Sequence, residues 1–155
     1  MIAPEFHRPE RRSALPAAGK LVEIKASPEE CRALAARFGL PEIHELACGF
    51  HLRPEAAGTV LAEARLTARV GQVCVISLEV FATTLAEDFA VRFVPEGAES
   101  DSVDLDAIDE IAMVGGILDL GEAAAQQVAL LLDPYPRAPN ARPQEGYAIG
   151  SDEEA

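Results

Sequence analysis

The fold is decided by one stretch of the chain: Glu45-Leu-Ala-Cys-Gly-Phe-His-Leu-Arg53, then Pro54-Glu-Ala-Ala-Gly58, then Thr59-Val-Leu-Ala-Glu-Ala-Arg-Leu-Thr-Ala-Arg-Val70. Apolar side chains recur at every second position on both sides of the short Pro/Gly segment. This alternation is typical of strands that bury one face. Two such runs joined by a turn predict a β-hairpin, whose first strand turns Leu46, Cys48, Phe50 and Leu52 to one side.

Three further segments have the composition of strands. Lys20–Lys25 and Glu87–Val94 alternate, and Pro95 ends the second of them. Gln72–Phe81 is strongly apolar, so we expect a strand that is buried on both faces. Gly71, just before it, marks a bulge or a bend.

The first predicted helix has a start signal and a stop signal. Ser27 can cap it, Pro28 suits the first helical position, and Glu30 can close a capping box. Gly39 supplies a left-handed stop, and Pro41 prevents the helix from resuming.

A second predicted helix runs from Asp119 to Asp133 and ends abruptly. Asp119 and Glu122 can form a capping box, and apolar residues recur at helical spacing behind them. Pro134-Tyr-Pro-Arg137 then forbids a helix and predicts a rigid, extended strap.

Composition indicates a folded, acidic protein. The 155 residues include 26 acidic and 13 basic side chains, for a net charge of −13. Such a surface repels phosphate backbones and attracts basic partners. No apolar run approaches a membrane-spanning length and no signal-peptide core is seen, so we expect a cytoplasmic protein without a membrane partner. Cys31, Cys48 and Cys74, an odd number, fit reduced buried thiols.

The negative charge is concentrated late in the chain, where no Lys or Arg lies between Arg92 and Arg137. We expect residues 96–116 to form a mobile acidic loop, with Val103–Ile111 as a transient strand or turn. Its carboxylates are Glu96, Glu99, Asp101, Asp104, Asp106, Asp109 and Glu110.

Together these patterns predict an α+β fold. Residues 1–139 form a single domain: a mostly antiparallel sheet, with a barrel-like curl as a variant, and two main helices packed on it. An extended N-terminal arm precedes the domain's first strand, and residues 140–155 are expected to be a disordered tail.

No motif in the chain indicates catalysis or a bound cofactor. His44, Cys48 and His51 would share a face on a helix, but on a strand His51 is separated from the other two, so we expect no metal site. Cys74 lies among valine and isoleucine, and we expect buried filler rather than a nucleophile there.

Two surfaces are candidates for binding. Arg53, Arg65 and Arg69 fall on the outward side of the hairpin, as a small phosphate-binding stripe or as a solvated strand face. Tyr135 and Arg137 belong to the strap, which is either a recognition segment or a rigid piece whose tyrosine packs on the sheet.

The order of several motifs resembles a known family. They are an arm with Pro4-Glu-Phe-His-Arg-Pro9, a central Val70–Glu79 segment with Cys74, the acidic loop, Asp119-Leu-Gly-Glu122 and Pro134-Tyr-Pro-Arg137. Over residues 4–139 the chain is similar to the YceD family, the large ribosomal RNA subunit accumulation proteins. The resemblance implies a role in accumulation of that RNA, in bacteria and plant organelles, and no catalytic activity.

One position departs from the family pattern. Many members have Cys-x-x-Cys in the central segment, whereas this chain has Cys74-Val-Ile-Ser77. A role that needs two neighbouring thiols, for redox chemistry or for metal, is therefore not expected here.

We accordingly expect a non-enzymatic accessory factor in large-subunit ribosome biogenesis that binds a basic ribosomal protein or a pre-ribosomal particle. The candidate partner-binding residues are Asp101, Asp104, Asp106, Asp109, Tyr135 and Arg137. Direct binding of ribosomal RNA through Arg53, Arg65 and Arg69 is the alternative, and a thiol-dependent enzyme that uses Cys74 is the third hypothesis.

Overall fold

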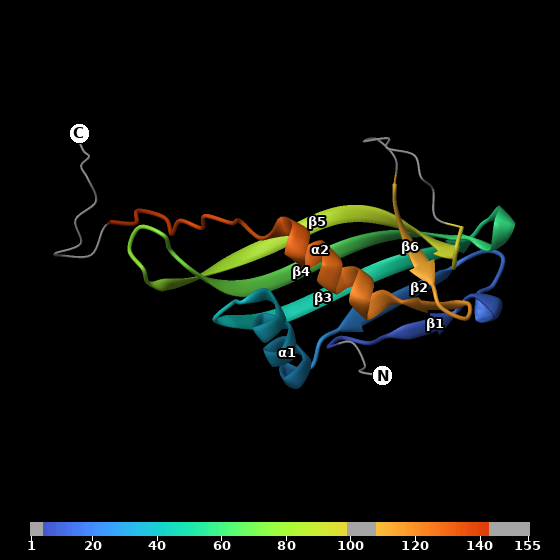
Figure 1. Cartoon of the computed structure of the whole chain (residues 1–155), viewed down its shortest axis with the longest axis horizontal. Coiled ribbons are helices and arrows are strands. Elements are labelled where there is room, and N and C mark those ends of the chain that lie inside the picture. Colours follow the sequence, from blue (N-terminus) through green and yellow to red (C-terminus); the bar gives the residue numbers. More distant parts are fainter. Residues whose placement is uncertain (1–4, 99–107, 143–155) are drawn as a thin grey trace.

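A five-stranded sheet forms the body of the protein (Figure 1). The computed structural model describes residues 5–98 and 108–142. Neighbouring strands are antiparallel except for the last pair, which is parallel. The sheet is open, so the barrel-like variant is not supported. In their order across the sheet the strands are β2 (Lys20–Lys25), β3 (Glu42–Pro54), β4 (Val60–Val73), β5 (Val80–Pro95) and β6 (Asp109–Met113).

The two helices lie on the same face of this sheet (Figure 1). They are α1 (Pro28–Phe38) and α2 (Leu120–Leu131). The signals predicted for α1 are confirmed, because Ser27 and Glu30 form the capping box and Gly39 ends the helix with φ of 69°. Within the described part of the chain, neither helix is long and apolar enough to cross a membrane.

The predicted hairpin of β3 and β4 is confirmed, and it builds the core under the helices. Pro54 pairs with Val60 at the turn, and Phe50 pairs with Ala64 midway along the strands. Leu46, Leu52 and the other residues of the predicted apolar face are buried on the helix side. The strand face opposite the helices is open to solvent, since every second residue of β4 from Glu63 to Arg69 is exposed. The bulge expected near Gly71 lies instead in β3, where the register shifts between Ile43 and Glu45.

The N-terminal arm is part of the fold. Its strand β1 (Pro9–Arg11) pairs antiparallel with β7 (Ile117–Asp119), next to α2. Phe6 in the same arm is fully buried in the core. Short 3₁₀ turns follow β1 (Arg12–Ala14) and β3 (Ala56–Gly58).

The prediction of a doubly buried strand at Gln72–Phe81 is wrong. β4 ends at Val73 and β5 begins at Val80, so residues 73–80 are the tip of a long hairpin. Figure 1 shows this tip extending beyond both helices. Because no helix covers it, Val73 and Val80 remain 43% and 53% exposed.

The prediction of one acidic loop over residues 96–116 is also wrong in part. Asp109–Met113 is the parallel edge strand β6, and Ile117 begins β7. Burial of Met113 and Leu118 explains this order, because apolar side chains fix both strands to the core. Residues 99–107 of the expected loop and residues 143–155 of the expected tail lie outside the described ranges.

Candidate functional site

The N-terminal arm closes on the start of α2 through Asp119. The Asp119 carboxylate accepts hydrogen bonds from the backbone N–H of Arg8 at 2.9 Å and of Gly121 at 3.1 Å. Its second oxygen contacts the His7 ring. Leu120 in turn donates its N–H to the Arg8 carbonyl at 3.0 Å. One carboxylate therefore caps the helix and fixes the arm.

Gly121 allows the arm to lie directly on the first turn of α2. A Cβ atom at this position would lie 2.7 Å from the carbonyl carbon of Phe6. Glycine is thus required for close approach of two backbones rather than for an unusual backbone angle.

Two arginines tie the arm and the helices together. Arg8 donates two hydrogen bonds of 2.7 Å to the Glu30 carboxylate on α1. The hydrogen bonds from Arg8 lower the pKa of Glu30 to about 2, against a smaller effect of burial. Arg37 on α1 donates to Glu122 on α2 and to Glu5 in the arm.

At the far end of the sheet, the strap closes on the hairpin tip. We define the strap as residues 133–139 and the tip as residues 73–80. Val75 donates its N–H to the carbonyl of Pro136 at 2.9 Å, and the Gln72 side chain donates to the Asp133 carbonyl at 3.2 Å. The strap is therefore fixed on the hairpin by one backbone–backbone hydrogen bond and one from a side chain.

Cys74 is at the centre of this contact. Its sulfur accepts backbone hydrogen bonds from Ile76, Ser77 and Ala138 at 3.3–3.4 Å. Burial raises the pKa of the Cys74 thiol, but the Ser77 side chain and these N–H groups outweigh burial and lower it to about 6. The side chain is buried as expected, and its hydrogen-bond surroundings favour the thiolate, which the sequence did not indicate.

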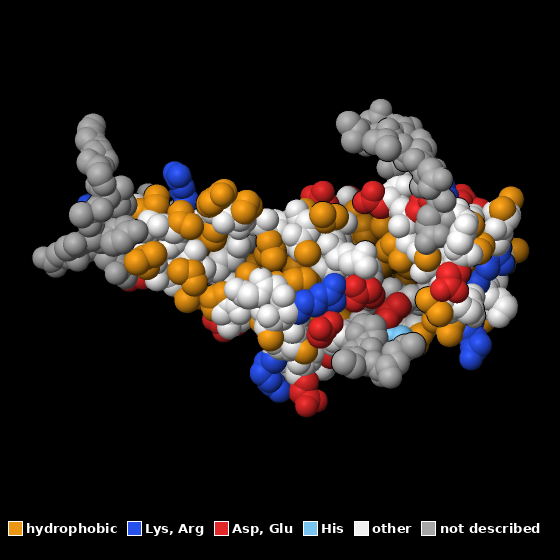
Figure 2. Space-filling view, viewed as in Figure 1, with side chains coloured by type: hydrophobic (Ala, Val, Ile, Leu, Met, Phe, Trp, Pro, Cys, Tyr) orange, Lys and Arg blue, Asp and Glu red, His pale blue; other side chains and the backbone are white. Residues whose placement is uncertain are grey.

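A groove of about 590 Å³ lies between the tip, the strap and the end of α1. Its walls are largely apolar, and include Phe38, Leu40, Val75, Leu132 and Pro136. Figure 2 shows hydrophobic side chains gathered around the tip and strap, at the left of the view. Tyr135 on the strap is 72% exposed, so its ring does not pack on the sheet.

Comparison with known proteins gives a family match over more than half of the chain. The family model described as "Large ribosomal RNA subunit accumulation protein YceD" matches residues 62–154. The chain belongs to the YceD family. No curated protein and no solved structure matches it.

The structure shows which of the quoted sequence motifs contact one another. Asp119-Leu-Gly-Glu122 contacts the arm with Phe6, His7 and Arg8, and Pro134–Arg137 contacts the Cys74 turn. The second pair lies wholly within the matched range of the YceD model, whereas the arm precedes it. Segments that are far apart in the sequence thus contact each other directly in the fold.

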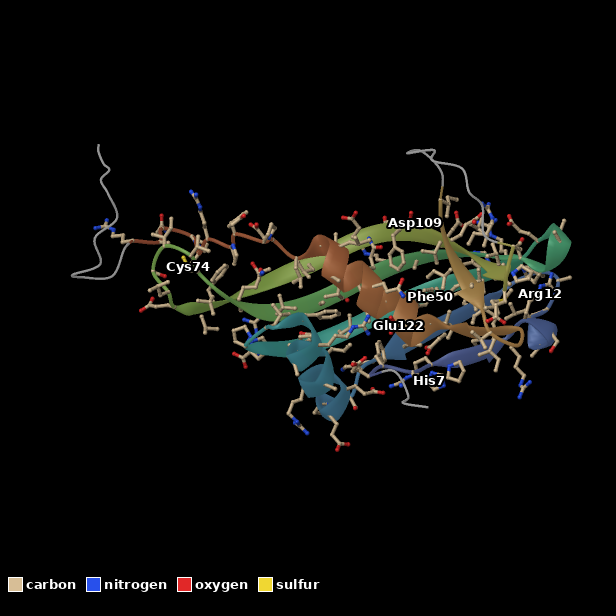
Figure 3. The ribbon with its side chains drawn as sticks, in the orientation of Figure 1. His7, Arg12, Phe50, Cys74, Asp109 and Glu122 are labelled. Atoms are coloured by element: carbon tan, nitrogen blue, oxygen red, sulfur yellow. The ribbon has the colours of Figure 1, made fainter. Side chains whose placement is uncertain are left out.

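The three candidate partner-binding residues within the described ranges lie in two different parts of the fold. Tyr135 and Arg137 are exposed on the strap, and Asp109 is exposed at the start of β6. Figure 3 places Asp109 far from Cys74 along the sheet, and Cys74 contacts the strap. The other three candidates, Asp101, Asp104 and Asp106, lie outside the described residues.

The candidate RNA-binding arginines share the open face of the sheet, but two of them already have partners. Arg53 is paired with Glu63, and Arg65 with Asp88 at 2.8 Å. Arg69 has no ion pair within the described residues. The three arginines lie on one face, but neighbouring carboxylates neutralise two of the three positive charges.

The three residues weighed as metal ligands are not assembled. Cys48 is buried on the helix side and burial raises its pKa to about 12, while His51 lies on the open face. The shift in register near His44 leaves that side chain exposed. No cluster of three or more His, Cys, Asp or Glu in the described ranges is arranged to hold a metal ion.

Sequence reasoning missed the exposed apolar surface of the tip. Its members are Val73, Val75, Leu78 and Val80. One signal could have indicated a turn, because the polar residues Ser77 and Glu79 interrupt the apolar run. Leu78 has a φ of 64°, which lies outside the range of strand residues. The sequence gives no signal for this backbone angle, because leucine rarely adopts a positive φ.

Proposed function

We propose that this YceD protein is a non-enzymatic accessory factor in large-subunit ribosome biogenesis and that it acts by binding a basic ribosomal protein. The family name supports the process, since it describes accumulation of large-subunit ribosomal RNA. The choice of a protein partner is supported by the net charge of −13.

Six of the 13 arginines and lysines are paired with a carboxylate within the protein. Each of six basic side chains has a carboxylate within 4 Å: Arg8, Lys20, Arg37, Arg53, Arg65 and Arg92. Several exposed carboxylates have no ion pair within the described residues: Glu23, Glu29, Glu45, Glu79, Glu87 and Glu96. The excess of 26 acidic over 13 basic residues in the whole chain is the observation that carries the proposal.

An excess of free carboxylates opposes contact with phosphate and favours a basic protein. Each RNA phosphate would have to be met by a local cation against a repulsive background. A basic protein is instead steered toward the surface, and its association is accelerated at low salt.

The test is affinity purification of the full chain from its host cells at low and at physiological salt, with and without nuclease. We expect basic ribosomal proteins to remain bound after nuclease treatment and to be lost as salt rises. Loss of all ribosomal proteins after nuclease would show an RNA tether and would overturn the proposal.

Kinetics with a matched control separate local from general electrostatics. Asp101, Asp104, Asp106 and Asp109 are changed together to Asn; in the control, Glu23, Glu29, Glu45 and Glu96 are changed to Gln, which removes the same charge. The first variant should slow association with the captured protein more than the control does, with little change in dissociation. An unchanged association rate in the first variant would remove the acidic segment from the mechanism.

A further inference from the structure

Among the described residues, the outer edge of β5 has no neighbouring strand along most of its length. β4 pairs with β5 over Val80–Phe93, whereas β6 pairs only with Val91–Pro95. Along the strand, every second residue of an antiparallel pair directs its N–H and C=O away from the partner, so about five residues between Val80 and Ala90 offer both groups outward. These residues make no other backbone hydrogen bond within the described ranges.

This edge lacks the features that normally prevent strands from pairing with other chains. Val80–Ala90 contains no Pro, Gly or Lys. The opposite edge of the sheet, β2, is short, has Lys20 and Lys25 at its ends, and is partly covered by Arg8, which bonds the Lys25 carbonyl at 3.0 Å. Protected and unprotected edges therefore occur in the same sheet.

The helix side of the free edge offers an apolar position at every fourth residue, with Thr83 and Glu87 between them. Phe81, Leu85 and Phe89 point to that side, opposite Gln72, Ala68 and Ala64, and are only half-buried. In line with the edge, a hollow of about 230 Å³ lies between β6 and α2, and Leu130 on its wall is 69% exposed. On this side an added strand would meet apolar and polar side chains in turn.

The charge along the edge selects the kind of strand. Glu79 and Glu87 are exposed there, Asp88 is paired with Arg65 of β4, and residues 79–91 contain no Lys or Arg. A second copy of this chain would bring another net charge of −13 to the same edge. A basic strand is attracted by the same field.

We propose that the basic partner binds by adding an extended segment to the free edge of β5. Apolar side chains of that segment face Phe81, Leu85 and Phe89, and a lysine or arginine on it faces Glu87. The inference rests on the proposed function, because it names how and where the basic protein is held.

The decisive measurement is residue-resolved amide exchange of the full chain. The probe is the basic protein captured from an RNA-free extract of large ribosomal subunits. On complex formation, alternate amides of Val80–Ala90 should gain at least about tenfold protection, whereas the amides of β2 should not change. A patch contact without strand addition would not produce alternation.

Matched variants test the same edge. Ala86 on β5 and Thr67 on β4 are exposed and directly opposite each other. Ala86→Lys places a cation on the edge itself, and Thr67→Lys adds the same charge one strand inward. Ala86→Lys should weaken binding at least about fivefold more than Thr67→Lys.

Three outcomes would overturn the inference in different ways. A complex that leaves Val80–Ala90 exchange unchanged would remove the edge and leave the proposed function intact. Capture of no basic protein would remove both. Protection of these amides in the free protein that grows with its concentration would show that a second copy occupies the edge.

Discussion

Arg37 of α1 donates two hydrogen bonds of 2.9 Å to Glu122 of α2. The pair explains why the capping box predicted for α2 is incomplete. Asp119 caps the helix as expected, but Glu122 is turned to the other helix instead of reaching back to the Asp119 backbone. A bidentate bond to a guanidinium is stronger than a single bond to a neutral N–H, so the tertiary partner wins.

The first prediction concerns this pair. Glu122→Gln should lower the free energy of unfolding by about 1–2 kcal/mol, because Arg37 loses its charged partner while both side chains stay partly hydrated. Urea denaturation measures the change, with Glu29→Gln as the control, since Glu29 is exposed on α1 without an ion pair among described residues. Equal stability of Glu122→Gln and the parent would show that the contact contributes nothing.

A second prediction concerns acid. Hydrogen bonds from Arg8 lower the pKa of Glu30 from 4.5 to about 2. The pair therefore stabilises the fold fully above pH 4.5 and loses this contribution as the pH falls toward 2. Allowing for screening by water, the loss should be about 1–2 kcal/mol. Denaturation of the parent and of Glu30→Gln across this window should show a shallower pH dependence in the variant; parallel curves would contradict the assignment.

The arm gives a third prediction. Phe6→Ala should cost about 3–5 kcal/mol, because a fully buried phenyl ring leaves a cavity. Gly121→Ala should also destabilise the protein, since the added methyl group would displace the Phe6 backbone. Leu21→Ala, at a side chain that is 79% exposed, is the control and should change stability little. A thermal melt of Phe6→Ala that matches this control would mean that the arm is not part of the core.

Cys74 provides the fourth prediction. Absorbance of the thiolate near 240 nm, as the difference between the parent and Cys74→Ala, should rise with a midpoint at about pH 6. Because this pKa is lowered from 9.0, stability from the thiolate is present above pH 9 and is lost as the pH falls toward 6. Cys48→Ala is the reference, since that thiol has its pKa raised to about 12. A midpoint for Cys74 near 9 would show that the N–H groups do not stabilise a thiolate.

Local signals in the sequence predicted the elements that depend on neighbours in the chain. α1 carries its cap, its first-turn proline and its terminal glycine within thirteen residues, from Ser27 to Gly39, and the structure has all three. The hairpin of β3 and β4 follows from alternation around one turn. Such features need no knowledge of distant contacts.

The predictions from sequence that fail are those in which a distant contact, or the absence of one, determines the structure. Glu122 meets Arg37 across 85 positions, which no capping pattern contains. Residues 73–80 are apolar enough for a buried strand, but periodicity cannot show that the helices end before reaching them. The prolines predict a rigid strap, but its contact with the Cys74 sulfur is visible only in the folded structure.

The pairing of β1 with β7 has a consequence for the order of folding during synthesis. Arg8 leaves the ribosome 111 residues ahead of Asp119, to which it bonds. At ordinary translation rates this separation is about 6–22 s. During that time α2 is not yet available to cover the aromatic ring of Phe6. The beginning of the chain is therefore exposed to chaperones and neighbouring chains until α2 has been made.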